Sequence, residues 1–269
     1  MNSSRGKKRV KAVILAGGVG SRLVEETHAK PKPLLEIGGK PVLWHIMKLY
    51  EWHGITDFII CAGYRADMMK EYFAGYMLRN ADIRVDTKTG AVHILKKAPE
   101  AWQVSVVDTG LETETGGRLK RIAQYVAKDP YFCMTYGDSL VNVDVSGAIA
   151  FHRKHKKLAT ISIVEPRSRF GNVQVEGDLV RKYEEKSKDP MLRLNAGFFV
   201  LSPGVLDYIQ NDRTVWEKGP LEKLAAQGNL AAWRHRGYWQ PMDTLAEHRQ
   251  LESMWRQGKA PWKVWRDPG

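Results

Sequence analysis

Short apolar runs alternate with segments of helical periodicity along the first two thirds of the chain. The runs predict buried strands at residues 10–15, 57–62, 104–108, 131–136 and 159–164. Apolar side chains spaced three and four residues apart predict helices between these strands, at residues 40–50, 68–78, 119–126 and 147–155. Such alternation is typical of a parallel or mixed sheet with helices on both faces, so we expect an α/β fold.

The pattern changes after about residue 165. Shorter and more polar segments predict strands at residues 173–175 and 180–184, with a further strand at 198–201 and a helix at 245–257. A short strand is also expected at residues 34–37. Because no segment rich in Pro, Ser and Gly divides the chain, we expect one domain over residues 10–269 that ends in a C-terminal extension.

Composition and charge exclude several classes of protein. The chain has 269 residues, of which 43% are hydrophobic and 27% charged, as in ordinary soluble globular proteins. No apolar run approaches the ~20 residues of a membrane helix, and the run that follows the basic N-terminal extension, residues 1–9, is too short for a signal peptide. We therefore expect a cytoplasmic protein with no membrane partner.

The net charge of +12 is spread along the chain without a nucleic-acid-binding motif. Small anionic substrates explain this excess as well as nucleic acid would, and we expect no nucleic-acid partner. Cys61 and Cys133 lie in apolar strands without metal-ligand spacing, so we expect both to pack in the core.

A glycine-rich loop follows the first predicted strand. It reads Gly17-Gly18-Val19-Gly20-Ser21-Arg22, and such glycines let backbone N–H groups approach phosphate oxygens. The loop lacks the ending of a Walker A motif and the last glycine of a dinucleotide-binding fingerprint. The glycines alone could form a tight turn, but Arg22 and Lys32, which lies between two prolines, add two cations beside it. Together they predict a phosphate-binding site.

Two aspartates stand at places suited to a metal ion. Asp138 follows the strand at 131–136, at the sheet edge where α/β proteins bind ligands, although a solvated turn would also suit it. Asp243 precedes the helix at 245–257, where capping is its alternative role; Thr244 and Glu247 form the capping box there and leave Asp243 available. A carboxylate near a triphosphate suits Mg²⁺, which prefers a few hard oxygen ligands plus phosphates. We therefore expect Asp138 and Asp243 to share one Mg²⁺ ion.

Several stretches resemble one enzyme family. Residues 11–22 with residues 30–33 are similar to the N-terminal motif of the sugar-1-phosphate nucleotidylyltransferases. Six further stretches extend the resemblance over nearly the whole chain, from about residue 10 to 266: residues 39–47, 107–110, 115–121, 135–138, 197–201 and 239–244. Two of these stretches point to the glucose-1-phosphate cytidylyltransferase branch of the family: Thr115-Gly116-Gly117-Arg118 and Trp239-Gln240-Pro241-Met242-Asp243.

The resemblance implies a fold, a reaction and a set of partners. The fold would be a Rossmann-like α/β/α sandwich of the nucleotidyltransferase and GT-A type, with a nucleotide-binding half at 10–165 and a sugar-phosphate-binding and oligomerisation half at 166–269. The reaction would be Mg²⁺-dependent transfer of a cytidylyl group from CTP to α-D-glucose 1-phosphate, giving CDP-glucose and pyrophosphate. The resemblance also implies a homo-oligomer.

The resemblance assigns roles residue by residue. Catalysis would fall to Arg22 and Lys32, and metal binding to Asp138 and Asp243. The nucleotide would be bound by Leu15, Ala16, Gly17, Gly18, Val19, Gly20, Ser21, Thr113, Arg118 and Gly137. The sugar phosphate would be bound by Glu185, Lys186, Lys188 and Asn195. Arg118, which only donates hydrogen bonds, would suit the N3 acceptor of cytosine; alternatively it begins a helix and points to solvent.

Some positions depart from the family's pattern. Ser139 follows Asp138 where glycine is usual, Ser187 replaces a usual proline, Gly219 stands where an acid is common, and residues 165–169 are more charged than expected. These departures leave open which sugar phosphate is used and whether Lys186 or Lys188 meets it. Two other classes are less well supported: a glycosyltransferase would usually have an Asp-x-Asp pair, which Asp138 lacks, and a non-catalytic sensing subunit would be free to lose Lys32 or the aspartates.

Overall fold

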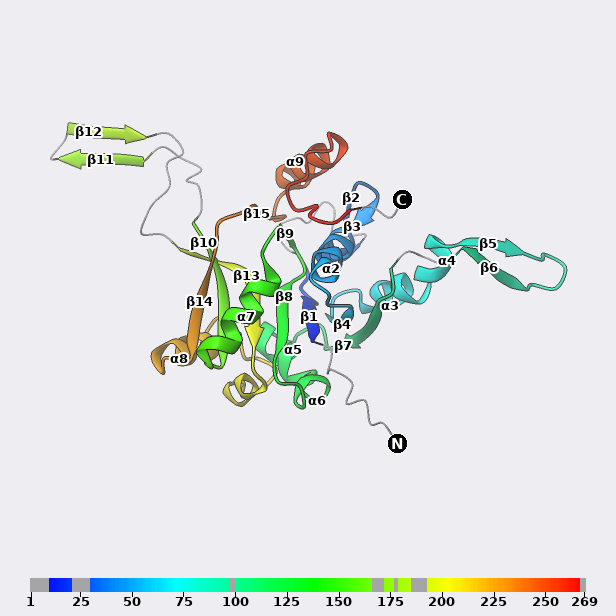
Figure 1. The fold of residues 1–269 in the computed structure, drawn as a ribbon, viewed down its shortest axis with the longest axis horizontal. Helices are drawn as coiled ribbons and strands as arrows, with labels where there is room; N and C mark the ends of the chain where they lie inside the picture. The colour runs from blue at the N-terminus through cyan, green and yellow to red at the C-terminus, as the bar shows by residue number, and fades with distance from the viewer. Residues whose placement is uncertain are drawn as a thin grey trace.

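A mixed seven-stranded sheet forms the centre of the molecule (Figure 1). The computed structural model describes residues 10–20, 30–96, 100–165, 172–176, 179–184 and 193–266. In spatial order the strands are β14 (Leu230–His235), β10 (Ala159–Val164), β13 (Leu194–Leu201), β8 (Phe132–Tyr136), β1 (Lys11–Ala16), β4 (Asp57–Ala62) and β7 (Gln103–Asp108). Neighbouring strands are parallel except around β13, which is antiparallel to β8 and β10. The predicted α/β class is confirmed.

Both faces of this sheet are buried, which explains why its central strands are apolar throughout. Alternate side chains of β1 point to opposite faces: Ile14 belongs to one core cluster and Val13 to the other. The first face is covered by α2 (Val42–Trp52), α3 (Ala66–Ala74), α7 (Val145–His155) and the C-terminal residues after α9 (Leu245–Arg256). The second is covered by α5 (Thr115–Arg121), α6 (Ala123–Val126), η3 (Pro203–Tyr208) and α8 (Pro220–Ala226). This arrangement confirms the α/β/α sandwich.

Three predicted elements are divided in the structure. The helix expected at 119–126 is α5 followed by α6, with the break at Ile122. The strand expected at 34–37 is a 3₁₀ turn, η2 (Lys32–Leu34), followed by β2 (Glu36–Ile37), which pairs with β3 (Lys40–Pro41). Pro33 holds φ in the range of such a turn and offers no N–H to a ladder. The helix expected at 68–78 is α3 and then α4 (Tyr76–Asn80), and the break falls at Gly75, a residue that weakens helices.

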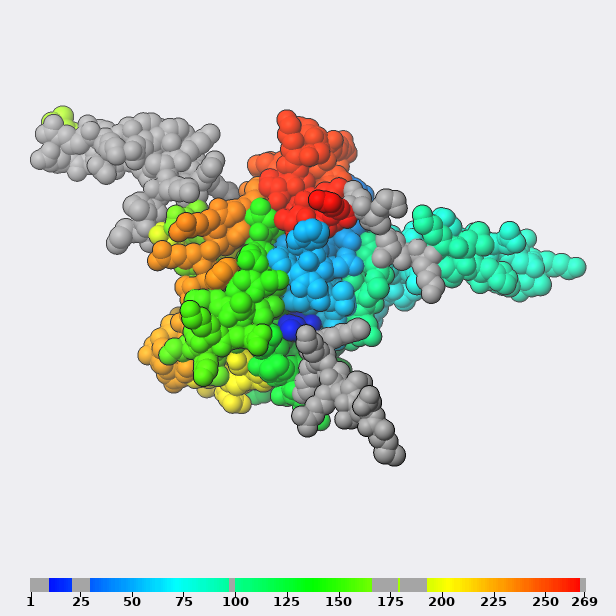
Figure 2. Space-filling model, in the orientation of Figure 1, coloured from blue at the N-terminus to red at the C-terminus, as the bar shows by residue number. Residues whose placement is uncertain are grey.

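The pattern analysis missed an arm made of β5 (Asp82–Val85) and β6 (Val92–Lys96). This antiparallel hairpin projects from the body next to α4 (Figures 1 and 2). Every residue of both strands is exposed, including Ile83, Val85, Val92, Ile94 and Leu95. Its strands do alternate polar and apolar residues, as in Asp82-Ile83-Arg84-Val85, but over only four to five residues and without the continuous apolar run that marks the central strands.

Other missed elements are α8, β14 and the short pair β9 (Ser139–Val141) and β15 (Trp239–Pro241). The polar strands expected at 173–175 and 180–184 are β11 (Asn172–Glu176) and β12 (Leu179–Glu184), which pair antiparallel. The division of the domain at residue 165 stays a prediction.

Two expectations from the sequence concern the packing of the two cysteines and the length of the helices. Cys61 and Cys133 are buried in the central strands, and burial raises the pKa of each thiol to about 12, so the core-packing role is confirmed. Within the described ranges, no helix has the length and apolar character needed to cross a membrane.

Candidate active site

The carboxyl ends of four parallel strands meet at one edge of the sheet. β8, β1, β4 and β7 are neighbours, so the loops that follow them start side by side. These loops begin at Gly17, Gly63, Thr109 and Gly137. Such an edge is where open α/β sheets bind their ligands, and it contains the predicted glycine-rich loop and Asp138.

The glycines of this edge permit close approach of backbones. Gly137 donates to the carbonyl of Leu15 at 3.0 Å, and a Cβ on it would lie 3.0 Å from Pro33 Cγ. A Cβ on Gly17 would lie 2.1 Å from the Arg118 guanidinium, whereas one on Gly18 would meet no described atom within 4 Å. Gly18 and Val19 are exposed. The loop is therefore tied down at Gly17 and open to a ligand at Gly18.

Arg118 is the residue that ties the loops together. Only 5% exposed, it donates from Nη1 to the Thr109 hydroxyl at 2.7 Å and to the Gly110 carbonyl at 2.8 Å, and from Nη2 to the Gly17 carbonyl at 3.0 Å. Further bonds of 3.2 Å reach the carbonyls of Ala62 and Leu111. Burial lowers the pKa of Arg118, but a guanidinium stays charged in proteins. One cation thus joins the loops after β1, β4 and β7.

Of the two roles considered for Arg118 from sequence, this arrangement excludes the solvent-directed one and does not test the other. The side chain does not point to solvent, and both terminal nitrogens donate to protein oxygens rather than being displayed to a ligand. Direct reading of a base by Arg118 stays a prediction, and it would require these bonds to be released. Thr113, the other expected nucleotide contact, is also buried, and its hydroxyl packs near Gly110.

Asp138 and Asp243 meet although they are far apart in sequence. Antiparallel pairing of β9 with β15 sets Ser139 opposite Pro241, and Met242 donates to the carbonyl of Asp138 at 2.9 Å. Asp138 immediately precedes β9, and Asp243 lies two residues after the end of β15. The structure therefore brings together the two acids expected to share a metal ion.

The ammonium of Lys32 lies between these acids. Lys32 Nζ is 2.9 Å from Asp138 Oδ2 and 2.7 Å from Asp243 Oδ1. The three side chains are 10%, 29% and 21% exposed, so the cluster is neither dry nor fully solvated. We call Lys32, Asp138 and Asp243 the acid–lysine cluster. Ser139, one of the departures from the family pattern, donates its hydroxyl to Asp138 Oδ1 at 3.3 Å.

The capping box predicted for α9 is confirmed. Glu247 N–H donates to the Thr244 hydroxyl at 3.3 Å, and Glu247 Oε2 accepts from the N–H groups of Thr244 and Asp243 at 3.0 and 2.8 Å. Thr244 and Glu247 thus cap the helix, and the Asp243 carboxylate is directed to Lys32 instead.

A second polar network, which the sequence did not reveal, lies beside the acid–lysine cluster. The Tyr136 hydroxyl donates to Glu217 Oε1, and the Thr115 hydroxyl donates to Glu217 Oε2 at 2.7 Å. Burial, then the charge of Glu217, raises the pKa of Tyr136. The Tyr136 ring packs against Gly197, where a Cβ would lie 2.7 Å from it. Because Tyr136 precedes Gly137 and Asp138, this network fixes the end of β8.

The predicted sugar-phosphate residues are only partly described. Asn195 lies in β13 next to the Tyr136 hydroxyl, and its Oδ1 accepts from Gly197 N–H at 2.8 Å. Five of the predicted site residues lie outside the described ranges, so their roles stay predictions: Ser21, Arg22, Glu185, Lys186 and Lys188. In the described ranges no group of three or more His, Cys, Asp and Glu side chains could hold a metal ion.

Comparison with known proteins decides the family. A family model for nucleotidyl transferases matches residues 11–267, nearly the whole chain. The chain belongs to the nucleotidyl transferase family. It is an enzyme of that family, as the resemblance predicted, and the glycosyltransferase and sensing-subunit alternatives are not supported.

Individual relatives of this nucleotidyl transferase cover its full length. It is 52% identical to the glucose-1-phosphate cytidylyltransferase of Salmonella typhi over 256 residues, 95% of this chain and 100% of that protein. It is 41% identical to a probable glucose-1-phosphate cytidylyltransferase of Bacillus subtilis over the same shares of both chains. The crystal structure of HddC from Yersinia pseudotuberculosis superposes with a TM-score of 0.68 at 23% identity, covering 91% of this chain and 99% of the other. The last likeness supports the fold alone.

Proposed function

We propose that this nucleotidyl transferase transfers a cytidylyl group from CTP to α-D-glucose 1-phosphate, giving CDP-glucose and pyrophosphate. The observation that carries the proposal is the acid–lysine cluster beside a glycine-rich loop at the ligand-binding edge of the sheet. The choice of CTP and glucose 1-phosphate rests on the 52% identity with the Salmonella typhi enzyme over its full length.

The acid–lysine cluster fits a divalent cation. Two carboxylate oxygens already converge on one cationic atom, the Lys32 ammonium, from the two strands at one end of the β9–β15 ladder. Two carboxylates are too few to enclose an ion, which suits Mg²⁺ because it keeps water and substrate phosphates as its other ligands. We propose that Asp138 and Asp243 would hold Mg²⁺. When bound, the ion would neutralise charge on the phosphates of the substrate.

The chemical step would need no general base from the chain. A monoester phosphate carries a charge of about −1.5 to −2 near neutral pH, so its oxygen can attack the α-phosphorus directly. One P–O bond forms to that oxygen, while the bond from the α-phosphorus to the bridging oxygen breaks and pyrophosphate leaves with its electron pair. The obstacle is repulsion between two anions. The chain would answer it with Lys32, whose ammonium can pass from the aspartates to a phosphate oxygen.

Arg118 would act on the nucleotide through the loop that it holds. By fixing the Gly17 carbonyl, it would hold the start of a loop whose Gly18 and Val19 are exposed, where backbone N–H groups could meet phosphate oxygens. By fixing the carbonyls of Gly110 and Leu111, it shapes the segment that leads to Thr113. We propose that selection of cytosine depends on this segment.

A grid of substrates tests the proposal. Pyrophosphate release is measured for CTP, UTP, dTTP, ATP and GTP, each with glucose, mannose and galactose 1-phosphates, with Mg²⁺. CTP with glucose 1-phosphate should give the highest kcat/KM. Equal values for UTP or dTTP would refute the cytidylyl assignment, and a better sugar phosphate would refute the acceptor. No release in any pair would refute catalysis by this chain.

We also propose that the enzyme is a homo-oligomer. On one face of the β5–β6 arm, the cross-strand pairs Val85–Val92 and Ile83–Ile94 are exposed at 49%, 46%, 37% and 41%, an unusual apolar row for a free hairpin. A second copy of the chain would bury it. Sedimentation of the wild type and of Val92→Asp should show a smaller species for the variant, with Lys88→Asp at the arm's tip as control. Equal sedimentation of all three would contradict this role of the arm.

A further inference from the structure

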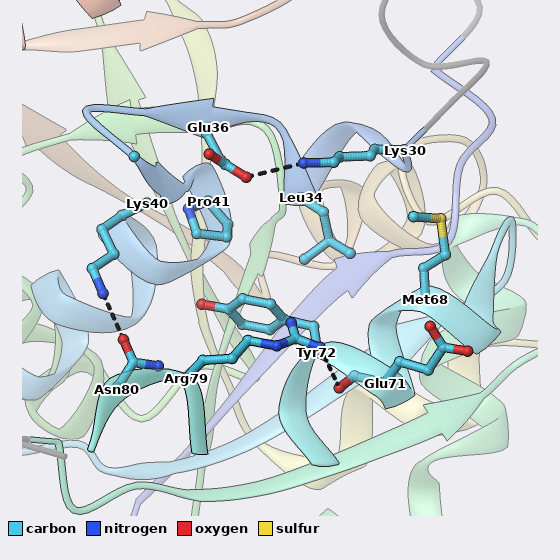
Figure 3. Close-up of a pocket in the computed structure, with 11 residues that line it drawn as sticks. Lys30, Leu34, Glu36, Lys40, Pro41, Met68, Glu71, Tyr72, Arg79 and Asn80 are labelled. Carbon is cyan, nitrogen blue, oxygen red and sulfur yellow. Dashed lines mark hydrogen bonds and ion pairs between the residues drawn. The ribbon is translucent and has the colours of Figure 1, made fainter. Parts of the chain in front are cut away.

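A pocket of about 350 Å³ lies beside the η2 turn (Figure 3). The pocket is lined by residues of four elements, among them Leu34 of η2, Lys40 of β3, Met68 and Tyr72 of α3, and Arg79 and Asn80 of α4. Its volume falls within the range of small-molecule sites, ~300–1,000 Å³. It shares no residue with the site described above.

Two cations in this pocket face neutral partners only. Lys40 Nζ donates to Asn80 Oδ1 at 2.6 Å, and Arg79 Nη2 donates to the backbone carbonyl of Glu71 at 3.2 Å. Across the described part of the chain, no carboxylate lies within ion-pair distance of either. The third cation, Lys30, differs because Glu36 pairs with it at 3.0 Å near the pocket's rim. Glu71 also lines the pocket, so three cations face two carboxylates, and a net charge of one positive unit remains.

The remaining wall suits a flat or apolar body. Figure 3 shows the Tyr72 ring across the middle of the pocket, with Leu34 above it and Met68 to one side. The Arg79 guanidinium lies 5.7 Å from the centre of the Tyr72 ring, so a cation and an aromatic face are presented together. A Cβ on Gly75 would lie 3.0 Å from the Arg79 guanidinium, so glycine at this position leaves room for the side chain to fold back over the helix break.

We propose that this pocket is a second ligand site, for a small molecule that carries a phosphate group on an aromatic or apolar body. Lys40 and Arg79 would bind the phosphate, exchanging neutral acceptors for an anionic one, and charge-assisted bonds are the stronger kind. Tyr72 and Leu34 would contact the body. Leu34 and Lys32 belong to the same 3₁₀ turn, so an occupant touches the turn that positions Lys32. Binding of a ligand in this pocket does not depend on the proposed function, whereas any effect of that ligand on turnover would rest on it.

Phenyl phosphate is the probe, because it has a phosphate and an aromatic ring but no nucleoside or sugar. Its binding to the full chain is measured by calorimetry for the wild type, Lys40→Gln and Arg79→Gln. Each variant should weaken binding about tenfold or more, the size expected on loss of one charge-assisted hydrogen bond. Lys70→Gln is the matched control, since Lys70 is an exposed cation on α3 outside the pocket. It should change binding less than threefold.

Lys32→Ala separates this site from the acid–lysine cluster, and it should also bind phenyl phosphate within threefold of the wild type. No binding to the wild type, equal binding by the Lys40 and Arg79 variants, or loss of binding in Lys32→Ala would each overturn the proposal. A second measurement needs no variant: phenyl phosphate should protect Lys40, and not Lys70, from acetylation followed by mass spectrometry. Equal labelling of Lys40 with and without the probe would also overturn it.

Discussion

Replacement of Lys32 by alanine separates two things that its ammonium can do. In the structure without substrate it neutralises Asp138 and Asp243, from which it lies 2.9 and 2.7 Å. In the proposed reaction it neutralises a phosphate. The first role affects the free enzyme, and the second affects the transition state, so the variant should change stability and rate by different amounts.

The loss of stability should be small. Without the ammonium, two carboxylates face each other, and two unit charges about 4 Å apart repel by about 4 kcal/mol at an effective dielectric constant of about 20. Their side chains are 29% and 21% exposed, so water screens much of this repulsion and we expect a net loss of about 1–2 kcal/mol. Excess Mg²⁺ should restore this loss, because a cation again lies between the acids.

The loss of rate should be larger and should resist Mg²⁺. Removing one preorganised charge contact costs about 10²–10³ in kcat/KM, or roughly 2.7–4 kcal/mol. The assay follows pyrophosphate release from CTP and glucose 1-phosphate at Mg²⁺ concentrations from well below to well above those of the nucleotide. Lys30→Ala is the matched control: Lys30 stands two residues earlier, and its ion pair with Glu36 is about half exposed, so little should change.

Two results would refute this reasoning about Lys32. Near-normal turnover in a folded Lys32→Ala variant would show that the residue contributes nothing to the reaction. Full recovery of the rate at high Mg²⁺ would show that it only neutralises the aspartates.

Three further predictions concern other parts of the chain. Arg118→Lys should lose about 2–4 kcal/mol in the free energy of unfolding, since a lysine cannot reach all the acceptors that the guanidinium binds. Arg121→Lys should change the same urea titration far less, because Arg121 and its partner Asp212 are exposed. Glu217→Gln should raise KM for the sugar phosphate about tenfold and leave KM for CTP within twofold. The reason is that Glu217 fixes Tyr136 beside Asn195, a predicted sugar-phosphate residue. An equal change in both constants would contradict this. Burial lowers the pKa of His45 from 6.5 to about 4, so the unfolded chain takes up this proton first as pH falls. The stability present above pH 6.5 should therefore decline toward pH 4 by at most about 3 kcal/mol. His45→Phe should flatten that slope in unfolding curves measured at each pH.

The buried strands could be predicted from sequence because each is apolar on both faces. Residues 57–62 and 159–164 were predicted with the bounds that the structure shows. The β5–β6 arm and the β9–β15 pair could not be found in this way. The strands of the arm alternate polar and apolar residues over only four to five residues, and β9 and β15 are only three residues each. None of them has the continuous apolar run by which the central strands were predicted.

The same difference applies to the site. Lys32, Asp138 and Asp243 were recognisable because each follows or precedes a predictable element, and the capping box explained why Asp243 differs from an ordinary helix cap. Glu217 was not recognisable. It lies in the loop before α8, and its only marks are contacts with Tyr136 and Thr115, which come from distant parts of the chain.

Arg118 shows most clearly what a single position in sequence leaves undecided. A cation in a Thr-Gly-Gly-Arg segment could point to a ligand or to solvent, and both alternatives assume that its partners lie outside the protein. In the structure its partners include carbonyl oxygens of two loops and of the last residue of β4, and Gly17 and Gly63 are needed beside it because a Cβ on either would lie within 2.4 Å of the guanidinium. Glycines near the predicted phosphate site can therefore serve two purposes: admitting a ligand is the predicted one, and these two admit an arginine. Only the fold distinguishes them, because it alone sets which side of each glycine Arg118 occupies.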